Sequence, residues 1–258
     1  MATHKLINFF TKQEVLEILK TVDSIEDKWI KRQVSPTNFY YTLGNESFVD
    51  CVEGVINESV IKEINKNNLM LKENLHFMYT SVISKISEMF GKCELATDIP
   101  IPGFFIYTER DGVQKRNNGI PNIHQDGKFE YLNYYWDTFK KVEHDSTFGF
   151  TVALQLPASG AGMCVWDEPD QGFYSNSEWA NEVKRSNFYL NPNSGNILDT
   201  YIVNKIPNVI EYSVGKALVQ QGAQYHSVAH GINLTQSDRR ITLQGFGKKC
   251  DGIWRLYL

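Results

Sequence analysis

The stretch from Phe148 to Trp166, FGFTVALQLPASGAGMCVW, decides the fold. Two runs rich in β-branched and aromatic residues, 148–156 and 163–166, flank a connection at 157–162 that contains proline and glycine. Such runs on either side of a Pro- and Gly-containing connection predict two β-strands joined by a turn. The glycines of this turn do not indicate a phosphate-binding loop, because a third glycine and a following helix are missing.

Three more strand-like runs lie on either side of this hairpin, at 104–107, 217–221 and 241–246. The sequence Pro-Ile-Pro-Gly at 100–103 precedes the first of them and separates it from the preceding chain. Many short strands at irregular spacing are typical of a jelly-roll barrel. Residues 93–258 are therefore predicted to form a double-stranded β-helix core of the jelly-roll, cupin-like type.

The region 1–92 has a different pattern, with helical periodicity. Thr11-Lys12-Gln13-Glu14 has the form of a capping box, and apolar residues follow it at three- and four-residue intervals. A second run of this kind extends from 75 to 89, and Gly91 is a suitable end for a helix there. We expect a layer of N-terminal flanking helices that supports the barrel, in an α+β, mainly β fold that forms a single domain over 1–258.

Composition argues against several classes of protein. The formal net charge is −4 and lysine and arginine form no long run, so we expect no nucleic-acid partner. No segment approaches the roughly 20 apolar residues that span a bilayer, and the N-terminus has no apolar signal-peptide core. The four cysteines are scattered, which favours reduced thiols and a cytoplasmic protein. No pattern specifies an oligomeric state.

Two histidines and an aspartate suggest a metal site. In His124-Gln125-Asp126, residues two apart in an extended segment project to the same face, so an imidazole and a carboxylate converge. His226, after a predicted strand, supplies a third ligand, and His230 is the alternative for that position. Two imidazoles and one carboxylate leave the opposite coordination positions open, which suits Fe(II) that must bind a co-substrate and O2 together.

The strand predicted at 241–246 carries a second set of polar residues. Arg240 and Thr242 alternate with Ile241 and Leu243, so one face of the strand offers a guanidinium and a hydroxyl together. This pair suits a carboxylate, because the planar guanidinium donates two charge-assisted hydrogen bonds and the hydroxyl a third. Arg239 is the alternative to Arg240, although strand alternation favours Arg240.

These motifs resemble those of a known family, the iron(II)/2-oxoglutarate-dependent oxygenases. His124-Gln125-Asp126, His226-Ser227-Val228 and Arg240-Ile241-Thr242 look like the His-x-Asp, distal His-x-Val and Arg-x-Ser/Thr motifs of that family, in the same order. The resemblance extends over about 100–247 and leaves the first 90 residues uncovered. Because His-x-Val is the usual form of the distal motif, the resemblance favours His226 over His230.

The resemblance implies a non-haem dioxygenase. His124, Asp126 and His226 would hold Fe(II), and Arg240 with Thr242 would bind the far carboxylate of the co-substrate 2-oxoglutarate, with O2 as the oxidant. The implied reaction is hydroxylation of an unactivated carbon of a small molecule, such as an amino acid or an amino-acid derivative. Halogenation is disfavoured, because relatives that halogenate usually replace the carboxylate that Asp126 supplies with a small residue.

Several aromatic residues near the motifs are candidates for the substrate pocket. They are Phe105, Tyr107, Tyr135 and Trp166, with Asp167 as a possible polar contact. Two other functions are compatible with a jelly roll that carries a few polar residues. One is a cupin-type metalloenzyme, an isomerase or dioxygenase that does not use 2-oxoglutarate, and the other is a non-catalytic binding module.

Overall fold

The fold is described from a computed structural model of the 258-residue chain. The residues that the structure describes are 3–35, 38–51, 56–108, 124–125, 132–158, 160–166, 206–221, 225–229, 235 and 237–258.

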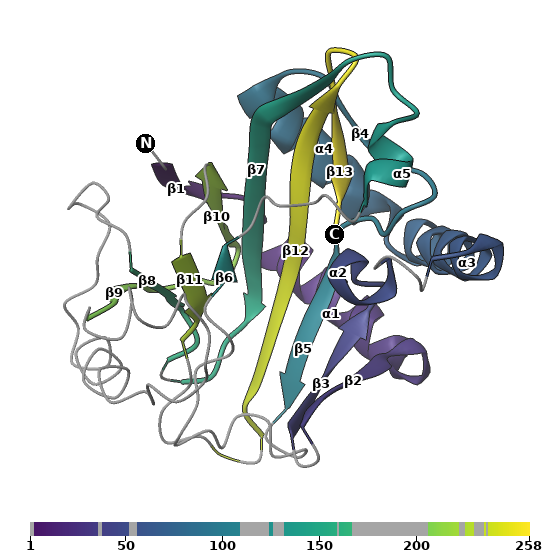
Figure 1. Ribbon diagram of the computed structural model, residues 1–258. Coiled ribbons are helices and arrows are strands. Elements are labelled where there is room, and N and C mark those ends of the chain that lie inside the picture. The colour runs from purple at the N-terminus through teal and green to yellow at the C-terminus, as the bar shows by residue number, and fades with distance from the viewer. Residues whose placement is uncertain are drawn as a thin grey trace.

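A large and a small β-sheet organise the described part of the chain (Figure 1). The large sheet has the order β1 (Thr3–Asn8), β10 (Lys216–Gln221), β7 (Val142–Gln155), β12 (Arg239–Cys250), β5 (Gly103–Thr108), β3 (Asn38–Leu43) and β2 (Ile30–Ser35). In addition, β13 (Ile253–Tyr257) pairs with β12 and with β4 (Cys93–Leu95). The small sheet has the order β6 (His124–Gln125), β11 (Tyr225–Val228), β8 (Met163–Val165) and β9 (Asn208–Ile210).

The path of the chain between the sheets is that of a jelly roll. From β5 to β12, the chain visits the large sheet at β5, β7, β10 and β12, and the small sheet at β6, β8, β9 and β11. All pairs among these strands are antiparallel. Two facing antiparallel sheets connected in this way form a double-stranded β-helix. The predicted fold class is confirmed, and each of the five predicted strands is present.

Helices pack against both faces of the large sheet. The long helices are α1 (Lys12–Ser24), α3 (Glu58–Asn74) and α4 (His76–Phe90), and the short ones are η1 (Glu26–Lys28), α2 (Ser47–Asp50) and α5 (Asn133–Trp136). The helices α1 and α4 lie on one face, and the short α2 and α5 lie on the other. The predicted capping box begins α1, since the Thr11 hydroxyl accepts from the backbone N–H of Glu14 at 3.2 Å and the Glu14 carboxylate from that of Thr11 at 2.7 Å. Gly91 follows the end of α4 as predicted. Among the described helices, none is long and apolar enough to cross a membrane.

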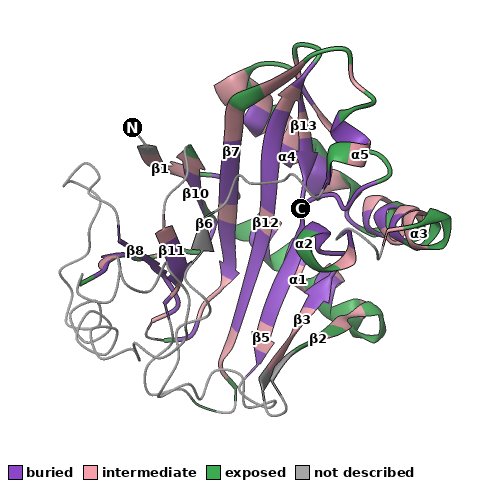
Figure 2. Cartoon of the chain, in the orientation of Figure 1, coloured by how far each residue is buried: buried purple, intermediate pink, exposed green. Residues whose placement is uncertain are grey.

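The main core lies between the helices α1 and α4 and the large sheet. Side chains of α1 and α4 pack against one face of β5, β7 and β12, and Figure 2 shows these strands as mostly buried. On β12, Ile241 and Leu243 belong to this core. At Gly245 and Gly247 the strand has no side chain, because the rings of Phe150 and Phe148 on β7 lie directly over them. A Cβ at Gly245 would stand 2.7 Å from the Phe150 ring, and one at Gly247 would overlap Phe148.

The N-terminal region differs from the expected helical layer. It contains the strands β1, β2 and β3, which extend the large sheet at both of its ends. The strand β1 pairs with β10, so Thr3 lies opposite Gln221, which is distant in the sequence. Each of these strands has six residues, and strands this short give little local signal.

We predict that Gly215→Ala destabilises the fold. Gly215 has a φ of +81°, and a Cβ there would lie 2.6 Å from the carbonyl oxygen of Phe10. Its own carbonyl accepts the backbone N–H groups of Phe9 and Phe10, so the loop has little room to move. The expected loss in the free energy of unfolding is about 2–4 kcal/mol, measured by urea denaturation.

Gly252→Ala is the matched control, because Gly252 has a φ of +78° and no atom lies within 4 Å of the place that a Cβ would take. Its free energy of unfolding should fall by only about 1 kcal/mol, which is the conformational cost of alanine at a positive φ. Equal losses in the two variants would contradict the steric part of this prediction.

Candidate functional site

The two predicted metal-binding histidines lie opposite one another in the small sheet. The strands β6 and β11 are antiparallel, and their register pairs His124 with His226. Directly opposed positions in an antiparallel pair share one face of the sheet. On its other side, β11 pairs with β8, where His226 lies opposite Val165, so His226 is fixed between two neighbours and is only 7% exposed.

The remaining candidates for the metal site lie outside the described residues. These are Asp126 and the alternative ligand His230, together with the side chain of His124. Among the described residues, no group of three or more His, Cys, Asp or Glu side chains is arranged to hold a metal ion. What the structure brings together is the pair of positions, His124 and His226, that are far apart in sequence.

Arg240 is a buried cation whose hydrogen-bond donors are not used by the described part of the chain. It is only 3% exposed, and its Nε, Nη1 and Nη2 atoms have no hydrogen-bond partner among the described residues. Thr242 is fully buried two residues further along β12, and its Oγ1 accepts a hydrogen bond from Gln244 at 3.2 Å. Burial of a charge without a partner costs several kcal/mol. The arrangement therefore fits an anion that accepts hydrogen bonds from the guanidinium.

Arg239 has a different environment from its neighbour. Its guanidinium forms hydrogen bonds with both carboxylate oxygens of Asp23 on α1, at 2.8 and 3.2 Å, and a third with Gln155 at 2.9 Å. The side chain therefore lies on the helix side of β12. Of the two arginines, Arg240 is the one with donors available on the opposite face.

Aromatic rings surround the Arg240 guanidinium. Its Cζ atom lies 5.3 Å from the centre of the Tyr107 ring and 5.6 Å from that of Tyr212, over the face of each ring. Tyr107 is the register partner of Arg240 on β5, and Phe105 is the partner of Thr242. Tyr212, which was not predicted from the sequence, lies just beyond β9. Nothing in the local sequence around Tyr212 marks it.

The other predicted substrate contacts are buried side chains. Phe105 is 6% exposed and Trp166 is 5% exposed, and the backbone N–H of Trp166 donates to the carbonyl of Tyr225 next to His226. Tyr135 lies on α5, where its ring packs against Trp136 and Phe139. These contacts account for the burial of Tyr135. Asp167 lies outside the described residues.

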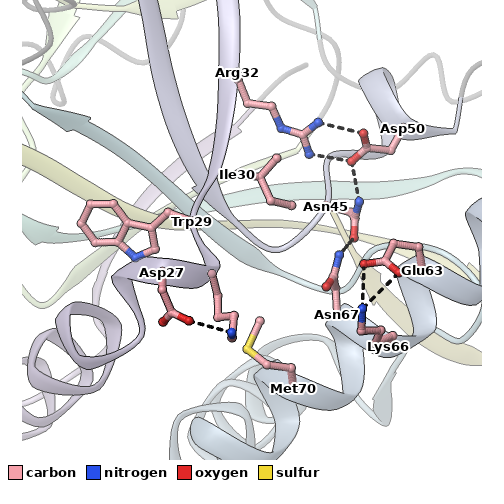
Figure 3. Close-up of a pocket in the computed structure, with 11 residues that line it drawn as sticks. Asp27, Trp29, Ile30, Arg32, Asn45, Asp50, Glu63, Lys66, Asn67 and Met70 are labelled. Atoms are coloured by element: carbon pink, nitrogen blue, oxygen red, sulfur yellow. Dashed lines mark hydrogen bonds and ion pairs between the residues drawn. The ribbon is translucent and has the colours of Figure 1, made fainter.

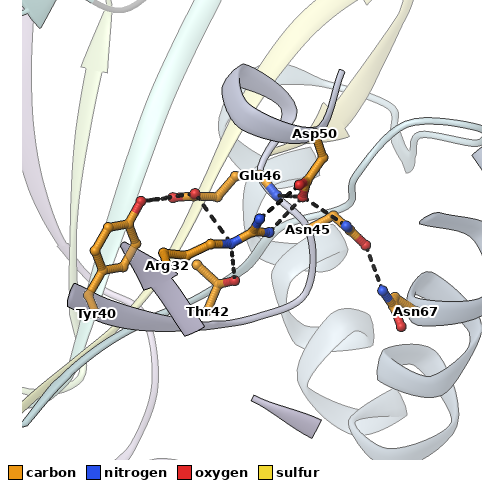
Figure 4. A network of polar contacts seen from close by, with 7 residues as sticks. All are labelled: Arg32, Tyr40, Thr42, Asn45, Glu46, Asp50 and Asn67. Carbon is orange, nitrogen blue, oxygen red and sulfur yellow. Dashed lines mark hydrogen bonds and ion pairs between the residues drawn. The ribbon is translucent and has the colours of Figure 1, made fainter. Parts of the chain in front are cut away.

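A network of charged residues from the N-terminal region adjoins this face of the sheet (Figure 4). Arg32 on β2 donates to both carboxylate oxygens of Asp50, at 2.8 and 2.6 Å. The hydroxyl of Tyr40 on β3 donates to Glu46, at 2.9 and 3.0 Å from its two oxygens. Glu46 is fully buried, and its Oε2 lies 3.7 Å from the Nε of Arg32. The network thus holds two carboxylates and one guanidinium.

The two carboxyl groups have opposite pKa shifts. Burial raises the pKa of Glu46 to about 7, against the effect of Arg32 and of the hydrogen bond from Tyr40. For Asp50, burial acts in the same upward direction, but the hydrogen bonds and charge of Arg32 outweigh it and lower the pKa. Burial and the charge of Glu46 raise the pKa of Tyr40, so this hydroxyl keeps its proton and acts as a donor. Near neutral pH, Glu46 is therefore the group of this network that titrates.

A polar pocket of about 540 Å³ lies next to this network, at the β2 edge of the large sheet (Figure 3). Its lining residues are Asp27, Lys28, Trp29, Ile30, Arg32, Asn45, Asp50, Glu63, Lys66, Asn67 and Met70. The charged ones pair with one another, Lys28 with Asp27, Arg32 with Asp50 and Lys66 with Glu63. None of the predicted site residues lines this pocket, so we place the functional site on the Arg240 side.

Comparison with known proteins identifies the fold. No protein-family model and no curated relative matches the sequence. Two crystal structures of an N-substituted L-amino acid dioxygenase from Burkholderia ambifaria AMMD are similar to this structure, one of them in complex with α-ketoglutarate, which is 2-oxoglutarate. This chain has the double-stranded β-helix fold of the 2-oxoglutarate-dependent dioxygenases. The TM-scores are 0.54 for the complex and 0.53 for the other structure, each at 10% identity over 99% of this chain and 86% of that chain.

We predict that Arg240→Met stabilises the protein when no ligand is bound. Methionine keeps most of the apolar stem of Arg240 and removes a buried charge that has no hydrogen-bond partner among the described residues. The free energy of unfolding should rise by about 1–4 kcal/mol, measured by urea denaturation without ligands.

Arg239→Met is the matched control, because it removes a partly exposed ion pair with Asp23. It should lower the free energy of unfolding by about 0–1 kcal/mol. A loss of several kcal/mol in Arg240→Met would mean that the protein itself satisfies this guanidinium.

We also predict that Glu46→Gln changes how stability depends on pH. A carboxyl group whose pKa is higher in the folded chain favours the fold at low pH, and this contribution is lost as pH rises from the unfolded value to the folded one. For Glu46 the interval runs from 4.5 to about 7. Between these two pH values the free energy of unfolding of wild type should therefore fall by about 3 kcal/mol relative to that of Glu46→Gln. Urea denaturation at several pH values measures this difference. Parallel profiles for the two proteins would contradict this assignment.

Proposed function

We propose that this chain is a non-haem Fe(II)- and 2-oxoglutarate-dependent dioxygenase. The observation that carries the proposal is the buried guanidinium of Arg240, whose three nitrogen atoms have no hydrogen-bond partner among the described residues. A carboxylate satisfies such a group well, because its two oxygens match the planar N–H donors. Thr242, on the same face of β12, offers a hydroxyl to the same carboxylate.

The proposed iron ligands are His124, Asp126 and His226. Support comes from the register of β6 and β11, which sets the two histidines opposite each other, and from Asp126, which follows His124 by two residues. When bound, iron(II) and 2-oxoglutarate supply the oxidising chemistry with O2. The chain holds these reactants in a fixed arrangement and keeps water away from them. The burial of His226 and Arg240 suits that role.

The proposed reaction is hydroxylation of an unactivated carbon of a small molecule, such as an amino acid or an amino-acid derivative. The substrate class is suggested by the similar dioxygenase from Burkholderia ambifaria, whose name refers to N-substituted L-amino acids. Two alternatives remain testable. A cupin-type metalloenzyme without 2-oxoglutarate has no use for a buried Arg240 that lacks a partner among the described residues, and a non-catalytic module has no use for opposed histidines.

We predict that anaerobic titration of the protein with Fe(II) and 2-oxoglutarate produces the visible charge-transfer band of a chelated 2-oxo acid. Arg240→Ala should raise the Kd for 2-oxoglutarate about 100-fold, because two charge-assisted hydrogen bonds are lost. Asp126→Ala should retain part of the band, since two imidazoles can keep iron, but should lose hydroxylation.

Arg239→Ala is the control in this titration, because Arg239 is paired with Asp23, and it should bind 2-oxoglutarate as wild type does. Iron binding without the band would contradict the use of 2-oxoglutarate and favour the cupin alternative. A wild-type protein that binds no iron would favour the binding module.

A further inference from the structure

Among the described residues, aromatic faces and no carboxylate compensate the charge of the Arg240 guanidinium. An acidic partner would neutralise the charge, but it would also occupy the N–H donors and compete with any incoming anion. Tyr107 and Tyr212 stand 5.3 and 5.6 Å from the Cζ atom, and the guanidinium lies over their ring faces. A ring face attracts a cation through its quadrupole and accepts no strong hydrogen bond. The charge is thereby stabilised while its donors stay available.

The two rings come from different layers of the fold. Tyr107 belongs to β5 of the large sheet, directly opposite Arg240 on β12. Tyr212 lies just beyond β9 of the small sheet and packs against a cluster that contains Met163 and Ile210 of that sheet. The guanidinium is therefore held where the two sheets of the barrel meet. Its position depends on both of them.

The Tyr107 ring has its own support from the N-terminal region. The ring of Tyr40 stacks on it with centres 5.5 Å apart and an angle of 20° between the planes. The Tyr40 hydroxyl is in turn fixed by Glu46 through the hydrogen bonds of the charged network (Figure 4). A row of side chains thus runs from Glu46 through Tyr40 and Tyr107 to Arg240. The β2–β3 hairpin, outside the region that carries the sequence motifs, contributes to the site in this way.

We propose that Tyr107 and Tyr212 are positioning residues for the carboxylate site, and that Tyr40 supports Tyr107 from behind. This inference rests on the proposed function, since the carboxylate is that of 2-oxoglutarate. The rings hold the guanidinium in place before the co-substrate binds. The Arg240 side chain is thus preorganised, and less conformational entropy is lost when its two hydrogen bonds to the carboxylate form. Through Arg240, the two tyrosine rings affect only the binding of the carboxylate that does not chelate the iron. Their effect should therefore be specific to 2-oxo acids that carry a second carboxylate.

The test compares Tyr212→Leu with Tyr212→Phe in anaerobic titrations of the iron-loaded protein. Tyr212→Leu should raise the Kd for 2-oxoglutarate roughly 2- to 30-fold, whereas Tyr212→Phe, which keeps the ring face, should stay within about twofold of wild type. The Kd for 2-oxobutyrate, which lacks the second carboxylate, should be the same in all three proteins. Tyr41→Leu is the control, because Tyr41 packs against Trp29 on the helix side of the sheet.

A second measurement does not depend on iron or on 2-oxoglutarate. Tyr212→Leu should lower the urea midpoint of the ligand-free protein more in the wild-type background than in the Arg240→Met background. In the Arg240→Met background the guanidinium that Tyr212 contacts is already absent, so the substitution removes no cation–π contact. Equal shifts in the two backgrounds would overturn the inferred contact.

The outcomes separate this inference from the proposed function. If wild type binds 2-oxoglutarate and Tyr212→Leu binds it equally well, the positioning role is wrong and the proposed function stands. A loss of affinity for 2-oxobutyrate as large as that for 2-oxoglutarate would also overturn the role, because it would indicate general damage to the site. If wild type binds no 2-oxoglutarate, both the proposed function and the inference fail.

Discussion

The alternation of side chains along β12 is the constraint on which the rest of the structure depends. This strand lies between β7 and β5 in the middle of the large sheet. Its odd-numbered residues Ile241 and Leu243 enter the core beneath the helices, while Arg240 and Thr242 are buried on the opposite face. A shift of one residue in register would exchange the two sets and place a guanidinium in the apolar core. The stability of the fold and the composition of the site are therefore determined by the same strand pairing.

Arg32 and Arg240 have opposite environments. Arg32 is fully engaged by Asp50 and Thr42, so it has a structural role in joining β2, β3 and α2. Arg240 has no hydrogen-bond partner among the described residues, and its guanidinium lies over the rings of Tyr107 and Tyr212. A protein selected for stability alone would have paired or replaced Arg240. An unpaired group at this position is the kind of local conflict that marks a binding site.

The sequence predicted the elements whose signals are local. The α1 capping box, the strands β7 and β8, and the alternation around Arg240 all follow from residues within a few positions of one another. The hairpin expected from β7 and β8 is wrong, because β7 lies in the large sheet and β8 in the small one. The strand β1 and the residue Tyr212 were missed because their partners are distant in the chain. The strands β2 and β3 and the residue Glu46 have partners nearby but carry no distinctive motif. Chemistry also mattered, because a histidine motif or an arginine beside a threonine has a recognisable function, whereas a lone tyrosine or glutamate does not. The order of the motifs was informative, but the register that sets His124 opposite His226 could only come from the structure.

The close approach of phenylalanine rings to glycines across β7 and β12 has a consequence for the history of this fold. Gly245 lies opposite Phe150, and Gly247 lies opposite Phe148, with no room for a side chain on β12 at either place. A diverging lineage gains room for a side chain at 247 only after Phe148 has become smaller, and at 245 only after both Phe150 and Pro102 have moved or become smaller. The order of substitutions is thus restricted, and the first step of each exchange leaves a cavity in the core. Descendants that have completed the exchange should carry a small residue on β7 wherever β12 has gained a larger one.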